Sequence, residues 1–330
     1  MQTLLNTPHE IIQQNILGAA AKAKTRILNI LVLGMMAGSF IAMGAQSSSL
    51  AVHNISNIGL ARTLAGCIFP VGLMMIVFVG GELFTGDCMM SMAWMQRKIH
   101  FADMLRTLVL VYVSNFVGAA LIAFLVAHSG QYDYSSGALG AYTIKVAYGK
   151  VHLSFANALV SGILCNILVC VAVLMAAAAK DIAGKVLAIF FPILAFVVSG
   201  FEHCVANMYY IPAGIFASKN AAYAAKALEL YNIDSTQLSS LNWGSFAISN
   251  LIPVTIGNII GANIMDLTLI MPLCALILGK PLPVERQGLL LDIPACLVVC
   301  AGALIPALVQ GKFKRWVGFF IGGLYIVYLV

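Results

Sequence analysis

The sequence predicts an all-α polytopic membrane protein, an inverted repeat of three plus three spans with two broken helices and about two extra C-terminal spans. Of its 330 residues, 61% are hydrophobic and 9% are charged, against about 25% charged residues in a soluble domain. Apolar runs of the roughly 20 residues needed to cross a bilayer recur from residue 26 to the C-terminus. Two of these runs are interrupted at matching places. The lipid bilayer is therefore the expected solvent of this chain.

The first 25 residues are predicted to form an amphipathic helix at the membrane interface. Apolar residues recur there at helical spacing, with basic residues near the end; the apolar set is Ile11, Ile12, Ile16 and Leu17. The segment lacks the basic-then-apolar order of a cleaved signal, so no processing is expected.

Eight spans are expected after this helix, at about 26–45, 63–95, 106–127, 152–179, 186–216, 245–278, 289–309 and 316–330. Eight Lys and Arg residues, Lys22 among them, lie before the first span, between the second and third spans and between the fourth and fifth, and the alternate loops carry five. This excess places the N-terminus in the cytoplasm, although the last loop, with Lys312 to Arg315, breaks the rule. The net charge of +6 includes no array of the kind that binds nucleic acid, so no nucleic-acid partner is expected.

The second and fifth apolar runs are interrupted by equivalent polar residues. Glu82 matches Glu202 and Asp87 matches Asn207, both at a separation of 120 positions. The third and sixth spans share a further Asn-x-x-Gly string, at 115–118 and 258–261. Two repeats of three spans must enter the membrane from opposite sides. Paired breaks in an inverted repeat mark a site at mid-membrane, where helix ends face a pathway instead of lipid.

Ionisable residues beside the breaks are the candidates for function. A charge at the bilayer centre costs roughly 2.5–3.5 kcal/mol even on an insertion scale, yet Glu82, Asp87, Glu202 and His203 lie there. The alternative for His203 is a packing imidazole bonded to a carbonyl. The alternative for the two glutamates is that they accept hydrogen bonds from backbone N–H groups freed at each break.

The eight cysteines all fall inside apolar runs, without the Cys and His pairing of a zinc site. They are interpreted as small membrane hydrophobes, and neither a metal nor a cofactor is expected.

Four strings of the chain resemble the formate/nitrite transporter family. They are GFEHCVANM at 200–208, ELFTG at 82–86, GILCN at 162–166 and NLIPVTIGNIIG at 250–261. The likeness runs from about residue 8 to residue 261. It implies a pore domain over 26–261 with an aquaporin-like helix arrangement and a homopentamer with one pore per subunit. It also implies transport of small monovalent anions such as formate, nitrite, hydrosulfide, acetate or lactate across the inner (plasma) membrane.

The resemblance also assigns roles by position. The substrate pathway and proton relay would contain His203, Thr85, Lys150, Glu202, Asn166 and Asn207. The apolar constrictions would be formed by Phe69, Leu73, Leu83, Phe84, Val169 and Phe196. Spacing alone would make these six ordinary packing residues.

Physical chemistry explains why such a pore needs a proton donor. A bare carboxylate-sized anion pays on the order of 20 kcal/mol to enter a dry constriction by the idealised Born estimate, whereas a neutral polar molecule costs roughly 2–7 kcal/mol. Lys150 would attract the anion, Thr85 would offer a hydroxyl donor, and His203 would give or share a proton. Transport is then channel-like or proton-coupled.

Residues 262–330 depart from this family. They resemble the end of one half of a cation/calcium exchanger, where a Gly-Asn-x-x-Gly-x-Asn helix leads into two closing spans. A working exchanger needs two ion-binding repeats with facing acidic residues, and one fragment is visible here. Asp266 and Asp292 are either leftover ion ligands or buried residues held by partners.

Three classes of function remain at this stage. Transport of a small anion is favoured, with formate first and nitrite, hydrosulfide or lactate as rivals. A cation antiporter built on the C-terminal segment is the alternative from another class. A membrane enzyme is disfavoured, because the sequence has no metal constellation and no nucleophile with a base at useful spacing.

Overall fold

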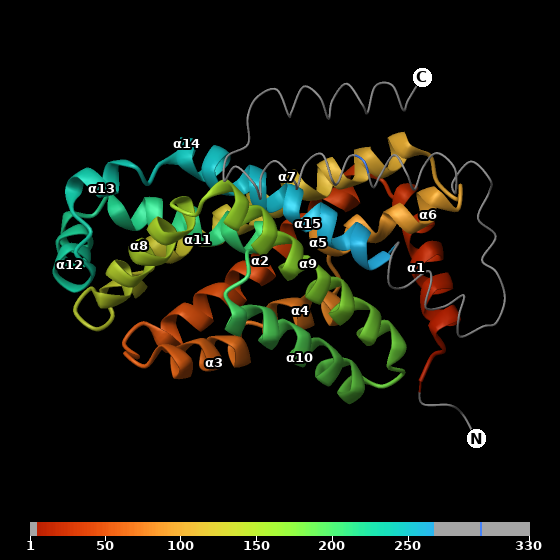
Figure 1. Ribbon diagram of the computed structural model, residues 1–330, viewed down its shortest axis with the longest axis horizontal. Coiled ribbons are helices and arrows are strands. Elements are labelled where there is room, and N and C mark those ends of the chain that lie inside the picture. Colours follow the sequence, from red (N-terminus) through yellow and green to blue (C-terminus); the bar gives the residue numbers. More distant parts are fainter. Residues whose placement is uncertain (1–4, 267–297, 299–330) are drawn as a thin grey trace.

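The computed structural model describes residues 5–266 and residue 298, and it is helical throughout (Figure 1). Within residues 5–266 there is no β-strand, only an isolated bridge between Leu5 and Ala179. Six helical segments of this part are long and apolar enough to cross a membrane: Ile27–Val52, Ile58–Val79, Phe101–Ala127, Phe155–Ala178, Ile182–Ser199 and Trp243–Ile264. The all-α prediction is confirmed, and the spans expected at 289–309 and 316–330 lie outside the described residues.

The N-terminal helix α1 (Pro8–Ala23) forms where the sequence predicts it. Thr7 and Glu10 make a reciprocal capping box and Pro8 occupies the first turn, which together satisfy the free N–H groups of the helix start. Ile12 and Ile16 are buried where α1 packs against α6 (Ser91–Met95), α7 (Phe101–Ala127) and α9 (Phe155–Ala178). The helix therefore covers the end of the molecule that carries α6 (Figure 1).

The second span is broken where the polar residues interrupt it. Helices α3 (Ile58–Ile68) and α4 (Val71–Val79) run up to Gly80, whose φ of 103° ends the helix in a conformation that favours glycine. The chain is extended at Leu83 and then resumes as α5 (Phe84–Asp87), which continues through the turn η1 (Cys88–Met90) into α6.

The fifth span has an equivalent break. Helix α10 (Ile182–Ser199) ends at Gly200, which has a φ of 72° and lies 120 positions after Gly80. Helix α11 (Cys204–Ser218) begins four residues later. Each of these spans therefore consists of two half-helices, and the second of each pair begins inside the protein, at the buried residues Phe84 and Cys204.

Two helix pairs hold the breaks between them. Helix α2 (Ile27–Val52) packs along α7, and α9 packs along α15 (Ile252–Ile264). A Cβ atom at Gly118 would lie 2.0 Å from the Met35 carbonyl oxygen, and one at Gly261 would lie 2.4 Å from that of Ile163. Small residues let these backbones approach closely, as is typical of membrane helix pairs.

The helices that lie between the expected spans were absent from the sequence prediction. Helix α8 (Ala138–Val151) occupies a segment expected to be a loop, because its 14 residues are too short to span and include Lys145 and Lys150. It packs against α11 and α12 (Ala221–Tyr231), at the end of the molecule opposite α1 (Figure 1). The short helices α13 (Ser235–Ser239) and α14 (Trp243–Ser245) follow, then a π-helical turn, η3 (Phe246–Leu251), leads into α15.

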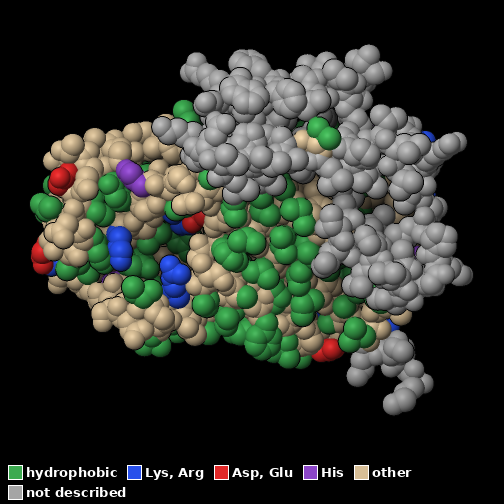
Figure 2. All heavy atoms as spheres, in the orientation of Figure 1, with side chains coloured by type: hydrophobic (Ala, Val, Ile, Leu, Met, Phe, Trp, Pro, Cys, Tyr) green, Lys and Arg blue, Asp and Glu red, His purple; other side chains and the backbone are tan. Residues whose placement is uncertain are grey.

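The surface matches the composition. Apolar side chains gather over α9 and α10 in the middle of the molecule, while Lys and Arg side chains lie toward the end that carries α8 and α12 (Figure 2). Ile182, Leu187 and Phe191 of α10 are more than half exposed. This exposed apolar middle is the surface that a bilayer would cover.

Candidate functional site

The two breaks bring Thr85 and His203 together. Thr85 lies in the first turn of α5 and His203 is the N-cap residue of α11. The Thr85 Oγ1 and His203 Nε2 atoms are 3.0 Å apart, and the two residues are 0% and 3% exposed. A hydroxyl and an imidazole thus form a polar centre in an otherwise apolar interior.

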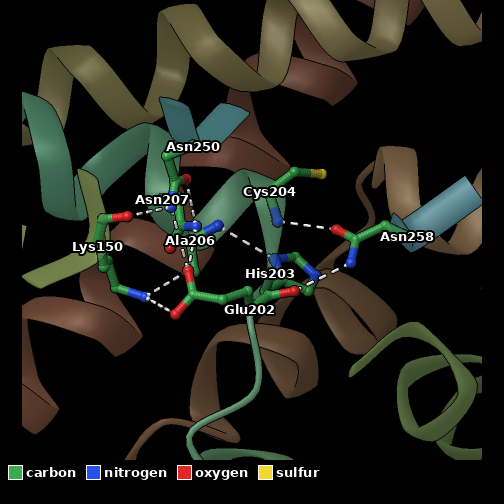
Figure 3. Close-up of polar contacts among 8 residues, drawn as sticks. All are labelled: Lys150, Glu202, His203, Cys204, Ala206, Asn207, Asn250 and Asn258. Carbon is green, nitrogen blue, oxygen red and sulfur yellow. Dashed lines mark hydrogen bonds and ion pairs between the residues drawn. The ribbon is translucent and has the colours of Figure 1, made fainter. Parts of the chain in front are cut away.

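Hydrogen bonding at the other ring nitrogen fixes the tautomer of His203. The backbone N–H of Ala206 donates to His203 Nδ1 over 3.1 Å, as an N-cap contact (Figure 3). Because Nδ1 accepts, the proton of the neutral ring is on Nε2, which donates to Thr85. The Thr85 hydroxyl proton is then left to point at a third group.

An ion pair lies on the α8 side of this centre. Lys150 Nζ contacts Glu202 Oε1 at 2.8 Å and Oε2 at 3.0 Å, with side chains 16% and 7% exposed (Figure 3). Asn207 Nδ2 donates to Glu202 Oε2 at 2.6 Å. The ammonium also lies 5.3 Å from the centroid of the Tyr210 ring, an attractive cation–π arrangement.

Asn250 fixes this ion pair to the backbone. Its Oδ1 accepts a 2.7 Å hydrogen bond from Asn207, and its Nδ2 donates to the Lys150 carbonyl at 2.9 Å (Figure 3). Asn250 lies on the π-helical turn η3, a kind of irregularity that is frequent at functional sites.

Asn258 satisfies the backbone groups that the second break leaves free. Its Oδ1 accepts the Cys204 N–H at 2.8 Å, and its Nδ2 donates to the carbonyls of Gly162 at 2.8 Å and Glu202 at 3.0 Å. Figure 3 shows the Cys204 and Glu202 contacts. Asn258 is fully buried, so each of these bonds replaces one that water cannot supply.

Asn115 makes the same set of bonds at the first break. Its Oδ1 accepts the Phe84 N–H at 2.9 Å, and its Nδ2 donates to the carbonyls of Gly34 and Glu82 at 2.8 Å each. The asparagines, and not the glutamate carboxylates, therefore take up the freed backbone groups. The Glu202 carboxylate instead contacts Lys150 and Asn207.

Asn166 joins the two breaks. Its Nδ2 donates to the Thr85 carbonyl at 3.2 Å and to the Asn258 carbonyl at 2.6 Å. Its Oδ1 is buried and has no hydrogen-bond partner among the described residues. The amide thus holds α5 against α15 and leaves one acceptor free beside the Thr85–His203 centre.

A family model described as formate/nitrite transporter matches residues 9–271, which include every residue of this polar centre. The chain belongs to the formate/nitrite transporter family. This membership makes it a multi-pass membrane transporter and not an enzyme, and it confirms the resemblance carried by the sequence strings.

Several curated members of the formate/nitrite transporter family are similar over most of their length. The uncharacterized transporter YrhG of Bacillus subtilis is 37% identical over 260 residues, which cover 78% of this chain and 89% of that protein. A probable formate transporter of Methanothermobacter thermautotrophicus is 37% identical over 264 residues, 74% of this chain and 89% of its own. The formate channel FocA of Escherichia coli K12 is 34% identical over 250 residues, 74% and 86% of the two chains.

Two solved structures share the fold. A pentameric formate channel with formate bound aligns with a TM-score of 0.66 and 30% identity, over 77% of this chain and 98% of that one. A channel described as an FNT family ion channel aligns with a TM-score of 0.67 and 24% identity, over 83% and 100% of the chains. The all-α membrane fold with six candidate spans is therefore confirmed, and the two extra C-terminal spans lie outside the described residues.

The C-terminal stretch matches a second family model, that of the sodium/calcium exchanger protein, over residues 243–330. The two matches overlap at 243–271, which includes the NIIG string where the sequence predicts the switch. Asp266 is buried and its Oδ2 accepts a 2.9 Å hydrogen bond from the Ser91 hydroxyl. Asp292 lies outside the described residues.

The six apolar residues assigned to constrictions of this transporter are all buried, between 1% and 5% exposed. Phe196 stacks on the His203 ring with centroids 6.1 Å apart, and Phe69 meets Phe196 edge-on at 5.4 Å. Leu83 and Phe84 flank the break beside Thr85, while Leu73 lies on α4 and Val169 on α9. Apolar groups thus cover the polar centre, and the role of a constriction stays a prediction.

Sequence reasoning missed four polar residues that complete the two breaks. The four are Asn115, Asn258, Asn250 and Lys22. The repeated Asn-x-x-Gly string included Asn115 and Asn258 but gave them no role. Lys22 of α1 contacts both Glu82 and Asp87, which the sequence had placed beside the break without a partner. The cysteines Cys88, Cys165, Cys170 and Cys204 are buried and unpaired.

Proposed function

We propose that this protein carries a small monovalent anion, formate first, past the buried Thr85–His203 pair. The observation that carries the proposal is the contact of Thr85 Oγ1 with His203 Nε2, a pair of hydrogen-bond donors enclosed by apolar groups. The N-terminus of α11 begins at His203, so its partial positive charge points at the same place. An anion held there meets the Thr85 hydroxyl, the imidazole N–H and the helix end.

Geometry favours a histidine that shares its proton over one that gives it away. A charged imidazolium needs protons on both nitrogens, but Nδ1 already accepts from the Ala206 N–H. Protonating Nδ1 would break this cap and bring two donors together. The neutral ring therefore keeps its Nε2–H on Thr85, and the Thr85 hydroxyl proton donates to the anion, while the compensating proton travels with the substrate.

The Lys150 group serves as the entrance on the α8 side. The ammonium is partly exposed, and its pairing with Glu202 leaves Lys150, Glu202 and Asn207 with no net charge. An approaching anion loses hydrogen bonds to water and gains the attraction of the ammonium. The group as a whole does not repel it, because its net charge is zero. Asn207 and Asn250 hold the Glu202 carboxylate by hydrogen bonds, so the Lys150 ammonium can turn toward the anion while Glu202 stays in position.

The choice of formate as substrate and of a homopentamer is supported by the descriptions of relatives. The orientation in the membrane is supported by the charges of the loops. Relatives at 34–37% identity are described as formate channels or a probable formate transporter, and the solved relative at 30% identity is pentameric. We place the chain in the inner (plasma) membrane with α1 on the cytoplasmic side, as the loop charges indicate. Nitrite, hydrosulfide and lactate are the competing substrates.

A stopped-flow liposome assay with formate, nitrite, hydrosulfide and lactate at two pH values tests the proposal. Wild-type protein is expected to accelerate formate uptake most. His203→Asn is expected to slow it roughly tenfold or more, the rate equivalent of about 1.4 kcal/mol. His128→Asn is the matched control, because His128 is exposed at the end of α7. Equal rates in His203→Asn and wild type would exclude the role of His203.

Cation exchange is the second candidate, and the match to the exchanger family at 243–330 favours it. Asp266 is the buried acidic residue that the structure places in this stretch. We propose anion transport instead, because Asp266 lies away from the contacts that join Thr85, His203 and Lys150. Calcium-dependent flux in the same liposomes, with no flux of any of the four anions, would reverse this choice.

A further inference from the structure

The break at Glu82 has its own lysine, supplied from the other end of the molecule. Lys22 Nζ contacts the carboxylates of both Glu82 and Asp87. Glu82 and Asp87 are the repeat equivalents of Glu202 and Asn207. The protein therefore builds a Lys–Glu group at each entrance, with the ammonium coming from α1 at one and from α8 at the other.

The two groups differ in charge by one unit. Lys150, Glu202 and Asn207 carry +1, −1 and 0, which sum to zero. Lys22, Glu82 and Asp87 carry +1, −1 and −1, which sum to −1. A small anion is attracted or tolerated at the first group and repelled at the second. Uptake of one proton by the second group makes its net charge zero as well.

Asp87 is buried beside a cavity, so a proton held there would change the charge that an anion in this cavity meets. Asp87 is 3% exposed, and its Oδ2 has no hydrogen-bond partner among the described residues. Asp87, Gly86 and Lys22 line a cavity of about 190 Å³ together with residues of α1. Protonated Oδ2 becomes a hydroxyl donor beside a positive ammonium, which is the pair of groups an anion requires.

Among the described residues, Lys22 is the cation that contacts the two carboxylates. Burial opposes the charge on Lys22, but Asp87 and Glu82 outweigh it and raise the pKa of this ammonium above its usual value. Two other charged side chains bond elsewhere: Arg106 of α7 donates to the Ala23 carbonyl, and Asp266 accepts a hydrogen bond from the Ser91 hydroxyl.

The thiol of Cys88, on the turn η1, is a further titratable group near Asp87. Two carboxylates on one ammonium repel each other, and such pairs hold one proton more readily than a lone carboxyl does.

From these contacts we propose that Asp87 makes the α1-side entrance proton-dependent: a small anion binds beside Lys22 only when the Glu82–Asp87 pair holds one proton. The inference rests on the proposed anion transport and adds an asymmetry to it. An anion that arrives from the α1 side meets this proton-dependent group first, so its entry depends on the pH of that side. An anion that arrives from the α8 side first meets a neutral group, so its entry does not depend on the pH of the α8 side.

Sided flux measurements on the full chain test the proposal. Formate uptake is measured in inside-out and right-side-out membrane vesicles, with sidedness assigned from the accessibility of an N-terminal tag. The external pH is varied from about 5.5 to about 8, because burial and a neighbouring carboxylate both make a carboxyl group hold its proton above the usual range. Wild-type uptake from the α1 side is expected to fall about tenfold per pH unit at the upper end, the slope of one proton.

Two substitutions that exchange a carboxylate and an amide distinguish the role of Asp87 from that of the residues around it. Asp87→Asn gives this entrance the composition of the other, and its pH slope is expected to flatten to less than about twofold per unit. Asn207→Asp is expected to confer a pH slope on uptake from the α8 side. Glu229→Gln removes one exposed charge from α12 and keeps the wild-type slopes. An unchanged slope in Asp87→Asn, or a flat α8 side in Asn207→Asp, overturns the proposal.

A binding measurement tests the same site without transport. Calorimetric titration of detergent-solubilised full chain with formate, in two buffers of different ionisation enthalpy, counts protons taken up per anion. Wild type is expected to take up more protons than Asp87→Asn, by up to one per site. Equal proton uptake overturns the proposal. Formate-linked proton uptake without flux retains the site and rejects the transport function.

Discussion

Thr85 and His203 lie 118 positions apart in the chain, yet their side chains meet at 3.0 Å. Each is placed by the half-helix that begins after a break, α5 for Thr85 and α11 for His203. The contact depends on the ends of two segments and on the asparagines that anchor them. The polar centre is thus a product of both halves of the repeat.

Replacing Thr85 by valine tests the hydroxyl of this pair. Valine keeps the shape and removes the donor, so His203 Nε2–H loses its acceptor and the anion loses one hydrogen bond. A hydrogen bond of this kind contributes about 0.5–1.5 kcal/mol, which predicts a roughly twofold to tenfold slower formate flux. Thr63→Val is the control, since Thr63 bonds only within α3 among the contacts described. Unaltered flux in Thr85→Val would show that the hydroxyl takes no part.

Removing Lys150 is expected to affect both stability and flux. In Lys150→Met the Glu202 carboxylate stays buried without its cation, and a broken buried pair costs about 3–5 kcal/mol. The double variant Lys150→Met with Glu202→Gln removes both charges and should recover much of that stability while flux stays low. Thermal unfolding in detergent and liposome flux measure the two effects. Recovery of flux together with stability would mean that the ammonium acts only as a structural partner.

Asn115 and Asn258 are expected to be equally important for folding. Leucine at either position leaves buried N–H and C=O groups unpaired, at about 1–3 kcal/mol for each group. We expect both variants to lower the unfolding temperature strongly. Asn263→Leu should not, because within the described part of the chain Asn263 bonds only to the Ile259 carbonyl of its own helix, at 3.0 Å. A mild effect of Asn258→Leu would show that water reaches the break.

Ending the chain after Asp266 tests the exchanger-like segment. The polar contacts described at Thr85, His203 and Lys150 come from residues before 262. Formate flux is therefore expected to stay within about twofold of the full chain, a change of roughly 0.4 kcal/mol. Flux normalised to the amount of folded protein is the measurement. Complete loss of flux in well-folded protein would assign the segment a part in transport.

The breaks were predictable because their signals are local. A glycine, a glutamate and polar neighbours inside an apolar run mark a helix that cannot continue, and the structure ends α4 and α10 at Gly80 and Gly200. The family resemblance grouped Lys150 with Glu202, but the helix that carries Lys150 was not predicted, because the 14 residues of α8 are too short to give a span signal. The contacts of Lys22 were not predicted, since the sequence counted Lys22 only as a topology charge.

The sequence by itself determined the membrane setting, the broken spans, the repeat spacing and the family, because hydropathy and short strings are properties of neighbouring residues. Only the tertiary structure decided which polar groups meet. It paired His203 with Thr85, gave the freed backbone to Asn115 and Asn258, and set Lys22 against two carboxylates where Lys150 faces one. These choices depend on how distant helices pack, since a hydrogen bond requires atoms within about 3 Å.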